Sequence, residues 1–211
     1  MRVGVRCSAP SFRSNLPSVN IPRILAFGGS LRKNSFNQKL AAIASEGARE
    51  AGAEVTLIEL RDFPMPLFDQ DLEAEIGKPE QAKRLKDLFL SHQGLLIASP
   101  EYNSSYSAAL KNAIDWVSRG DTPDESPISA LAGKSAVIMA TSPGGLGGLR
   151  GLVPLRMLLG NLGITLLPDQ IAIPSAFQAF GPDGHLVDPK QEAKVKALGA
   201  ALTLQLKKAL A

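Results

Sequence analysis

Residues 23–37 read Arg-Ile-Leu-Ala-Phe-Gly-Gly-Ser-Leu-Arg-Lys-Asn-Ser-Phe-Asn, and this stretch decides the fold class. The apolar run at 24–27 predicts a buried strand that Gly28 and Gly29 end, and an alanine-rich helical pattern comes next. A strand that turns on glycine into a helix directs backbone N–H groups and the positive end of the helix dipole at one place, which suits an anion and most often a phosphate. We therefore predict a phosphate-binding loop with side-chain donors from Ser30, Arg32, Ser35 and Asn37.

The same loop has a plain structural alternative. Asn34 or Ser35 ahead of a helical pattern is typical of an ordinary helix N-cap. A cap alone does not need the paired glycines together with Arg32 and Asn37. The loop also lacks the Gly-Lys-Ser/Thr of a P-loop and the Gly-x-Gly-x-x-Gly of a dinucleotide-binding turn, so it matches neither of these phosphate motifs.

Strand and helix patterns alternate along the rest of the chain. Strands are expected at residues 24–27, 54–60, 94–99, 135–141 and 164–173, and helices at 38–51, 79–91, 107–118, 148–161 and 189–210. The first, third and fourth strands are continuous apolar runs, typical of strands buried on both faces, whereas Pro168 places the last strand at an edge. This order predicts an α/β fold, a flavodoxin-like three-layer sandwich with a five-stranded parallel sheet of order 2-1-3-4-5.

We expect two polar residues near the end of the helix at 79–91 to lie on the surface. The periodic pattern turns Lys86 toward solvent and Leu85 toward the core. His92 lies just after the helix, and we expect it on the surface rather than in catalysis.

The charge pattern divides the chain into two parts. The 211 residues carry a net charge of +3, but four arginines lie in the first 23 residues and the first acidic residue is Glu46. Without those four arginines, 19 basic residues stand against 20 acidic ones, so the remainder lacks the basic excess that a nucleic-acid backbone attracts. We predict a basic, serine- and arginine-rich extension at residues 1–22, one domain at 23–211, and no nucleic-acid partner.

The extension leaves the location of the protein open. It resembles an organelle transit peptide, but an unstructured extension or a start codon assigned too far upstream explains it as well. The single cysteine, Cys7, allows no internal disulfide, so we expect a cytoplasmic protein, with an organelle as the alternative. No apolar run approaches the ~20 residues of a membrane span. The two histidines show no metal-ligand spacing, so we expect no metal.

Two further unusual loops come after the third and fourth strands. Residues 99–106 read Ser-Pro-Glu-Tyr-Asn-Ser-Ser-Tyr and hold both tyrosines of the chain. Their turn and Tyr102 offer a flat surface to an aromatic ring, with Asn103 as a hydrogen-bonding group, or else form a packed turn whose tyrosines cover the next helix. Residues 141–150 contain four glycines in a span of five residues, which allow a ligand to approach the backbone closely or form a flexible linker.

These three loops would end neighbouring strands of a 2-1-3-4-5 sheet. Ligands of such sheets bind beyond the carboxyl ends of the strands, near the point where the strand order reverses. The three loops together predict a pocket with a phosphate end and a flat aromatic end, and FMN fits that shape.

The loops resemble the motifs of the NADPH-dependent FMN reductase family, which includes small quinone, chromate, azo-dye and flavin reductases with a flavodoxin-like fold. The resemblance runs from about Ile24 to the C-terminus and is most specific at Pro100-Glu101-Tyr102-Asn103 and the later Leu110-Lys111-Asn112-Ala113-Ile114-Asp115-Trp116. It implies FMN as cofactor and NADPH or NADH as co-substrate. It places the cofactor against twelve residues, namely Ser30, Arg32, Ser35, Phe36, Asn37, Pro100, Glu101, Tyr102, Asn103, Ser142, Gly144 and Gly145.

The resemblance also implies an activity. It is that of an FMN-dependent NAD(P)H oxidoreductase, in which a hydride passes from nicotinamide to flavin N5 and then to a quinone, azo, metal-oxyanion or free-flavin acceptor by a ping-pong mechanism. The flavin carries the chemistry, so no side-chain acid, base or nucleophile is required. A homodimer or homotetramer is expected, with residues 64–71 at the mouth of the cleft. The alternative is a flavodoxin-like electron carrier without NAD(P)H activity of its own, although such carriers are usually strongly acidic.

Overall fold

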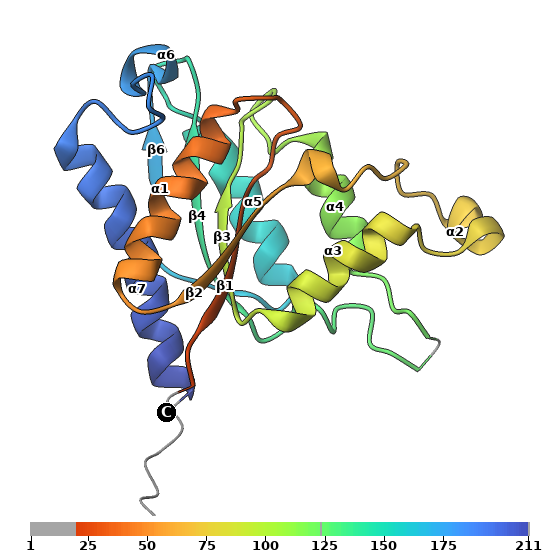
Figure 1. Cartoon of the computed structure of the whole chain (residues 1–211). Helices are drawn as coiled ribbons and strands as arrows, with labels where there is room; N and C mark the ends of the chain where they lie inside the picture. The colour runs from red at the N-terminus through yellow and green to blue at the C-terminus, as the bar shows by residue number, and fades with distance from the viewer. Residues whose placement is uncertain (1–19, 123, 211) are drawn as a thin grey trace, which may run out of the picture.

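The parallel sheet runs through the centre of the computed structural model, which describes residues 20–122 and 124–210 (Figure 1). Its strands are β1 (Arg23–Gly28), β2 (Glu54–Glu59), β3 (Gly94–Ala98), β4 (Ser135–Thr141), β5 (Thr165–Leu166) and β6 (Ile171–Ile173). All pairings are parallel in the order β2-β1-β3-β4-β5, and β6 also pairs with β4. The predicted flavodoxin-like topology is confirmed, with a sixth strand added. Residues 1–19 of the predicted extension lie outside the described residues.

Burial on both faces explains the uninterrupted apolar runs. All five residues of β3 and all seven of β4 are buried. Along β1, Ile24 and Ala26 join the core under one helical layer, and Leu25 and Phe27 join the core under the other. Alternate residues of an apolar strand therefore serve two separate cores, which a parallel sheet between two helical layers requires.

Seven helices and one 3-10 turn are found in the described residues. The helices α1 (Phe36–Glu50) and α7 (Pro189–Leu210) cover one face of the sheet, and α3 (Glu80–Ser91), α4 (Ala108–Val117) and α5 (Leu149–Asn161) cover the other (Figure 1). The short elements η1 (Leu60–Asp62), α2 (Gln70–Ile76) and α6 (Ala176–Ala179) were not expected, so the expectation of five helices was too low. None of the helices described is long and apolar enough to cross a membrane.

The last expected strand divides into two. Residues 164–173 form β5 and β6, with Pro168 in the connection between them, and both short strands pair with β4 at the edge of the sheet. Proline has no N–H group to donate to a neighbouring strand, so the pairing is interrupted where the sequence indicated an edge.

Lys86 is fully buried, so its predicted position on the solvent side of α3 is wrong. Its Nζ donates to Asp121 Oδ2 at 2.7 Å, to Glu125 Oε1 at 2.7 Å and to the Arg119 carbonyl at 3.0 Å. Hydrogen bonds from Lys86, from Ser129 and from the Asp121 N–H lower the pKa of Glu125 from its ordinary 4.5 to about 2. The segment after α4 supplies both carboxylates and covers Lys86. The sequence pattern of α3 alone gives no sign of this segment.

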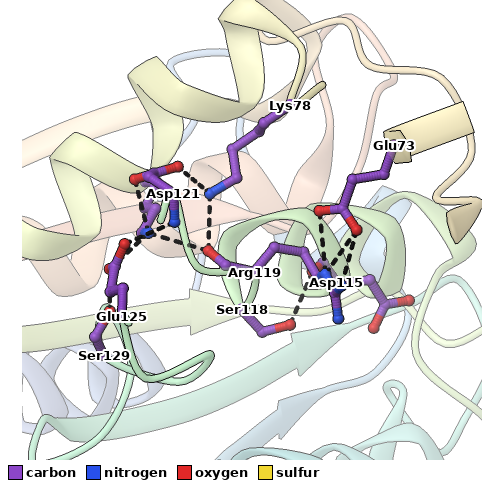
Figure 2. Close-up of polar contacts among 9 residues, drawn as sticks. Glu73, Lys78, Asp115, Ser118, Arg119, Asp121, Glu125 and Ser129 are labelled. Carbon is purple, nitrogen blue, oxygen red and sulfur yellow. Dashed lines mark hydrogen bonds and ion pairs between the residues drawn. The ribbon is translucent and has the colours of Figure 1, made fainter. Parts of the chain in front are cut away.

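The same polar network holds α2, which has no buried residue (Figure 2). Arg119 Nε donates to Glu73 of α2 at 2.9 Å, and Lys78 Nζ donates to the Arg119 carbonyl at 2.8 Å and also pairs with Asp121. Ion pairs rather than apolar packing thus fix this outlying helix and the segment that leads to it.

His92 is also buried, so the expectation of a surface residue is wrong. One ring nitrogen lies 2.6 Å from the Leu88 carbonyl and the other lies 2.7 Å from Thr56 Oγ1. Burial is the largest cause that lowers its pKa from 6.5. His92 therefore joins α3 to β2 and takes no part in the candidate site.

Two glycines allow α1 and α7 to pack unusually closely. A Cβ atom at Gly199 would lie 1.9 Å from the Ala44 carbonyl oxygen, and one at Gly47 would lie 2.0 Å from the Lys196 carbonyl oxygen. Both obstacles are backbone atoms, so only a movement of one helix could relieve the overlap.

We predict that Gly199→Ala lowers the free energy of unfolding by about 1–3 kcal/mol, the usual cost of overpacking a core. Urea denaturation followed by circular dichroism measures this change. Gly160→Ala is the matched control, because a Cβ there meets nothing within 4 Å. In a helix that control exchange gains up to about 1 kcal/mol in propensity. Equal stability of the two variants would contradict the close contact.

Candidate functional site

The three unusual loops meet at the carboxyl ends of β1, β3 and β4. They enclose a small crevice of about 60 Å³. Nine of the twelve predicted site residues line it, together with Thr141 and Pro143; the nine are Ser30, Arg32, Ser35, Phe36, Asn37, Pro100, Glu101, Tyr102 and Ser142. The remaining three, Asn103, Gly144 and Gly145, belong to the same loops but do not line the crevice. The sheet order therefore brings the predicted residues to one place.

The N-terminus of α1 opens onto the crevice without a side-chain cap. Ser35 occupies the N-cap position, but its side chain makes no capping hydrogen bond, in contrast to Asp69 of α2 and Ser107 of α4. The helix-cap alternative is therefore correct for the position of Ser35, but the side-chain hydrogen bond of an ordinary cap is not formed. The first N–H groups of a helix have no partner within the helix, so here they remain available to an anion. Ser30 is buried beside them, and Arg32 is exposed.

The Asn37 side chain joins the first loop to the third. Its Nδ2 donates to the Thr141 carbonyl at 2.9 Å, and its Oδ1 accepts from the Thr141 N–H at 3.0 Å. Both residues are buried, and this paired contact fixes the start of α1 against the end of β4. Asn37 still has one amide hydrogen for a ligand, since its Nδ2 carries two.

The second loop is a tight two-residue turn. The N–H of Tyr102 donates to the Ser105 carbonyl at 2.9 Å, and the Ser105 N–H donates back at 3.1 Å. The residues between them, Asn103 and Ser104, have φ values of +51° and +65°. Positive φ at both central residues is typical of a type I′ turn and is costly for serine, and such strain gathers at functional sites.

The two tyrosines of this loop have different positions. Tyr106 is half-buried and packs against the core, as expected for a packed turn. Tyr102 is 51% exposed and lines the crevice, so its ring is open to a flat ligand. The packed-turn alternative therefore describes Tyr106 and not Tyr102.

The Glu101 carboxylate fixes the second loop against α5. It accepts from Arg150 Nε at 2.7 Å through Oε1 and from the Gly151 N–H at 3.2 Å through Oε2. The charged end of Glu101 is thereby committed to the start of a neighbouring helix. Any contact of Glu101 with a ligand would accordingly involve its backbone.

The glycine-rich loop contains two kinds of glycine. A Cβ at Gly147 would lie 2.6 Å from the Ile173 carbonyl carbon, so this residue serves the packing. A Cβ at Gly145 would meet nothing within 4 Å, and one at Gly144 would meet only Ser142 Oγ at 3.9 Å. The loop is held by backbone hydrogen bonds, including Gly147 N–H to Gly144 O at 3.1 Å, so it is not a flexible linker. Space for a ligand lies over Gly144 and Gly145.

Three hydrogen bonds join helix α4 to the segment at residues 66–68 beside the crevice. Asn112 Nδ2 and Trp116 Nε1 each donate to the Pro66 carbonyl at 2.9 Å, and Asn112 Oδ1 accepts from the Phe68 N–H at 2.7 Å. A neighbouring cleft of about 250 Å³ is mostly apolar, and its lining comprises Leu31, Leu60, Arg61, Phe63, Pro64, Met65, Ala109, Asn112 and Ala113. Leu31 stands between this apolar cleft and the crevice, within the first loop.

Sequence reasoning missed Thr141 and Ser107. Ser107 donates through Oγ to the Gly29 carbonyl and accepts from the Leu110 N–H at 3.1 Å, which ties the first loop to the start of α4. The only sequence signal for Ser107 was its place as the first residue of the helix expected at 107–118, and the partner of Thr141 lies 104 residues away.

The comparisons with known proteins agree with this geometry. Residues 22–178 match the family model described as NADPH-dependent FMN reductase. An NAD(P)H-dependent FMN reductase of Pseudomonas aeruginosa is 34% identical over 88% of this chain and 96% of the relative. An NADPH:quinone oxidoreductase of Arabidopsis thaliana is 35% identical over 82% of this chain and 86% of the relative. The solved structure of a flavoenzyme NAD(P)H:(acceptor) oxidoreductase from Paracoccus denitrificans has a TM-score of 0.73 and 29% identity and covers 89% of this chain and 98% of its own.

Proposed function

The chain belongs to the NADPH-dependent FMN reductase family, and as the function of this NAD(P)H-dependent oxidoreductase we propose electron transfer from the nicotinamide through FMN to a small quinone. The observation that carries the proposal is the uncapped N-terminus of α1, which meets a flat open surface at the same crevice. An enzyme is favoured over the electron carrier because the family and these relatives are named for reduction by NADPH or NAD(P)H.

The described residues fit FMN at both of its ends. We assign its phosphate to the N–H groups at the start of α1, with Ser30, Ser35 and Arg32 as further donors. The crevice of about 60 Å³ suits a phosphate and not the whole cofactor. We assign the ring system to the surface of Tyr102 with the backbone of Asn103, Gly144 and Gly145, where a Cβ on either glycine would occupy open space.

FMN, when bound, supplies the reversible two-electron chemistry, and we propose ping-pong kinetics in which nicotinamide and acceptor use one ring face in turn. The tasks of the chain are to hold the phosphate, to expose one ring face and to direct backbone N–H groups toward the ring edge that gains negative charge. The second and third loops supply those N–H groups. No histidine or cysteine is among the described lining residues of the crevice.

A quinone is favoured among the four acceptor classes by the apolar cleft beside the crevice. Its lining includes Leu31, Phe63 and Met65, with Arg61 as its charged side chain. Such a lining suits a flat, uncharged ring better than a metal oxyanion, because most of it offers nothing to replace the hydration of an anion and Arg61 already pairs with Glu59 at 3.5 Å.

Steady-state kinetics of the purified full chain, loaded with FMN, test the function. We expect NADPH oxidation with a naphthoquinone at a higher kcat/KM than with chromate, an azo dye or free FMN, and parallel lines in double-reciprocal plots. NADH is assayed beside NADPH. A protein that stays colourless after addition of FMN would overturn the cofactor assignment. A yellow protein that does not oxidise either nicotinamide would be the electron carrier instead.

We predict that Arg32→Ala weakens FMN binding by about 1.5–3 kcal/mol, the range of a hydrogen bond to a charged group. Titration of flavin fluorescence measures the dissociation constant. Lys33→Ala is the matched control, because Lys33 is an exposed neighbour that does not line the crevice. Equal affinities of the two variants would remove Arg32 from the phosphate site.

We also propose that the enzyme is an oligomer of identical chains, joined through an apolar stripe on α5. Leu149, Val153 and Met157 recur every four residues on this helix and are 45%, 68% and 65% exposed. The two arginines of α5 are bonded within their own chain: Arg150 pairs with the Glu101 carboxylate, and Arg156 donates to the neutral Gln170 side chain. The stripe continues directly from the glycine-rich loop, where one ring face of the cofactor would otherwise face water.

Sedimentation velocity tests the stripe. We expect Val153→Glu to shift the protein to a monomer, because two carboxylates would meet at the symmetric contact. The control is Leu204→Glu, which changes an apolar residue of α7 that is 54% exposed. It is expected to leave the sedimentation coefficient unchanged. A wild-type chain that sediments as a monomer would overturn the proposal.

We further propose a cytoplasmic reductase domain at 23–211 preceded by an extension at 1–22. The match to the family model begins at residue 22, and the single cysteine, Cys7, allows no internal disulfide. Fusion of residues 1–22 to a fluorescent protein tests the location. Diffuse fluorescence is expected, and import into an organelle would favour the transit-peptide alternative.

A further inference from the structure

A group of potential metal ligands lies outside the candidate site. Glu46 of α1, His185 of the segment before α7, and Glu192 of α7 each place a ligand-type atom within 4.8 Å of the others. It is the one such group found among the residues that the structure describes. Neither the oxidoreductase activity nor the predicted cofactor contacts involve these residues.

Glu192 sets the orientation and the tautomer of the His185 ring. Its Oε1 lies 3.1 Å from His185 Nδ1, and its Oε2 accepts the Leu186 N–H at 2.8 Å. A carboxylate accepts only, so we assign the ring proton to Nδ1. The opposite nitrogen, Nε2, then carries a lone pair. This carboxylate–histidine pair is the arrangement that presents an imidazole to a metal ion in many proteins.

The Nε2 nitrogen lies near the Glu46 carboxylate. The distance from Nε2 to Glu46 Oε1 is 4.0 Å, which is too long for a hydrogen bond. Two ligand atoms of one tetrahedral zinc ion, each bonded at about 2.0–2.2 Å, lie about 3.4 Å apart, so a side-chain shift of about half an ångström brings both atoms to the same ion. The other carboxylate oxygen, Oε2, lies 2.8 Å from Lys196 Nζ, which fixes the carboxylate while Oε1 stays available.

The surroundings leave room for water ligands. Glu46 and His185 line a polar hollow of about 510 Å³ that also includes Asp183 and Lys39. The two side chains therefore offer one nitrogen and one oxygen donor, and water from the hollow completes the coordination. Zinc accepts this mixed donor set, whereas calcium and magnesium prefer six or more oxygen ligands.

We propose that Glu46 and His185 bind a Zn²⁺ ion through Oε1 and Nε2, with Glu192 as the positioning residue for the ring. The ion would join α1 to the segment before α7. Two protein ligands without a thiolate make this a reversible site that fills and empties with the zinc supply. The proposal does not depend on the proposed function.

Isothermal titration calorimetry with ZnCl₂ tests the site. The experiment uses the full chain with Cys7→Ser, which removes the only thiol, after treatment with a chelator. We expect one zinc per chain, with at least tenfold weaker binding in Glu46→Gln and in His185→Asn. Glu192→Ala is expected to weaken binding by a smaller factor. Two ligand variants are used so that a folding defect in either one does not decide the result.

Glu50→Gln is the matched control. Glu50 also lies near Lys196, at 3.4 Å, but it does not belong to the group of potential ligands. The zinc affinity of this variant should equal that of the Cys7→Ser protein. A thermal unfolding midpoint that rises with Zn²⁺ and not with Mg²⁺ gives a second readout, and this rise should vanish in Glu46→Gln. Unchanged zinc affinity in both ligand variants, or an equal response to Mg²⁺, would overturn the site.

Discussion

The burial of the central strands on both faces is the constraint on which the rest of this structure depends. Strands β3 and β4 are covered on both faces, so their polar backbone groups are satisfied within the sheet, and exposed polar groups appear only where the strands end. Because the strands are parallel, all the carboxyl ends lie at one edge. The loops after β1, β3 and β4 build the candidate site at that edge, and Asn37 locks the first and third of these loops together.

Much of the fold could be predicted because its elements carry strong local patterns. The apolar runs of β1, β3 and β4 and the long helices α1, α5 and α7 needed no knowledge of distant residues. Lys86 and His92 could not be placed this way, because their burial depends on partners from other elements. Asp121 and Glu125 neutralise the charge of Lys86. Thr56 and the Leu88 carbonyl lie within hydrogen-bond distance of the two ring nitrogens of His92. A charged residue is expected to be exposed until its counter-charges are known.

The candidate site, like the fold, could be predicted from the sequence only in part. Nine of the twelve residues predicted to contact the cofactor line one crevice, because loop composition and strand order together were enough to bring them there. The sequence did not reveal the tasks of individual side chains. The Glu101 carboxylate binds the start of α5, and Asn112 and Trp116 donate their hydrogen bonds to the Pro66 carbonyl. These tasks depend on three-dimensional neighbours, and no spacing along the chain encodes them.

The close contact between α1 and α7 has a consequence for how this enzyme is made. The helix that presents its first turn to the crevice rests, through Gly47 and Gly199, on the last helix of the chain. A ribosome makes α7 long after α1, so α1 lacks this support while the chain between the two helices is synthesised. A chain without α7 would therefore lack the surface on which the first helix of the site rests, although α7 contributes no residue to the described lining of that crevice.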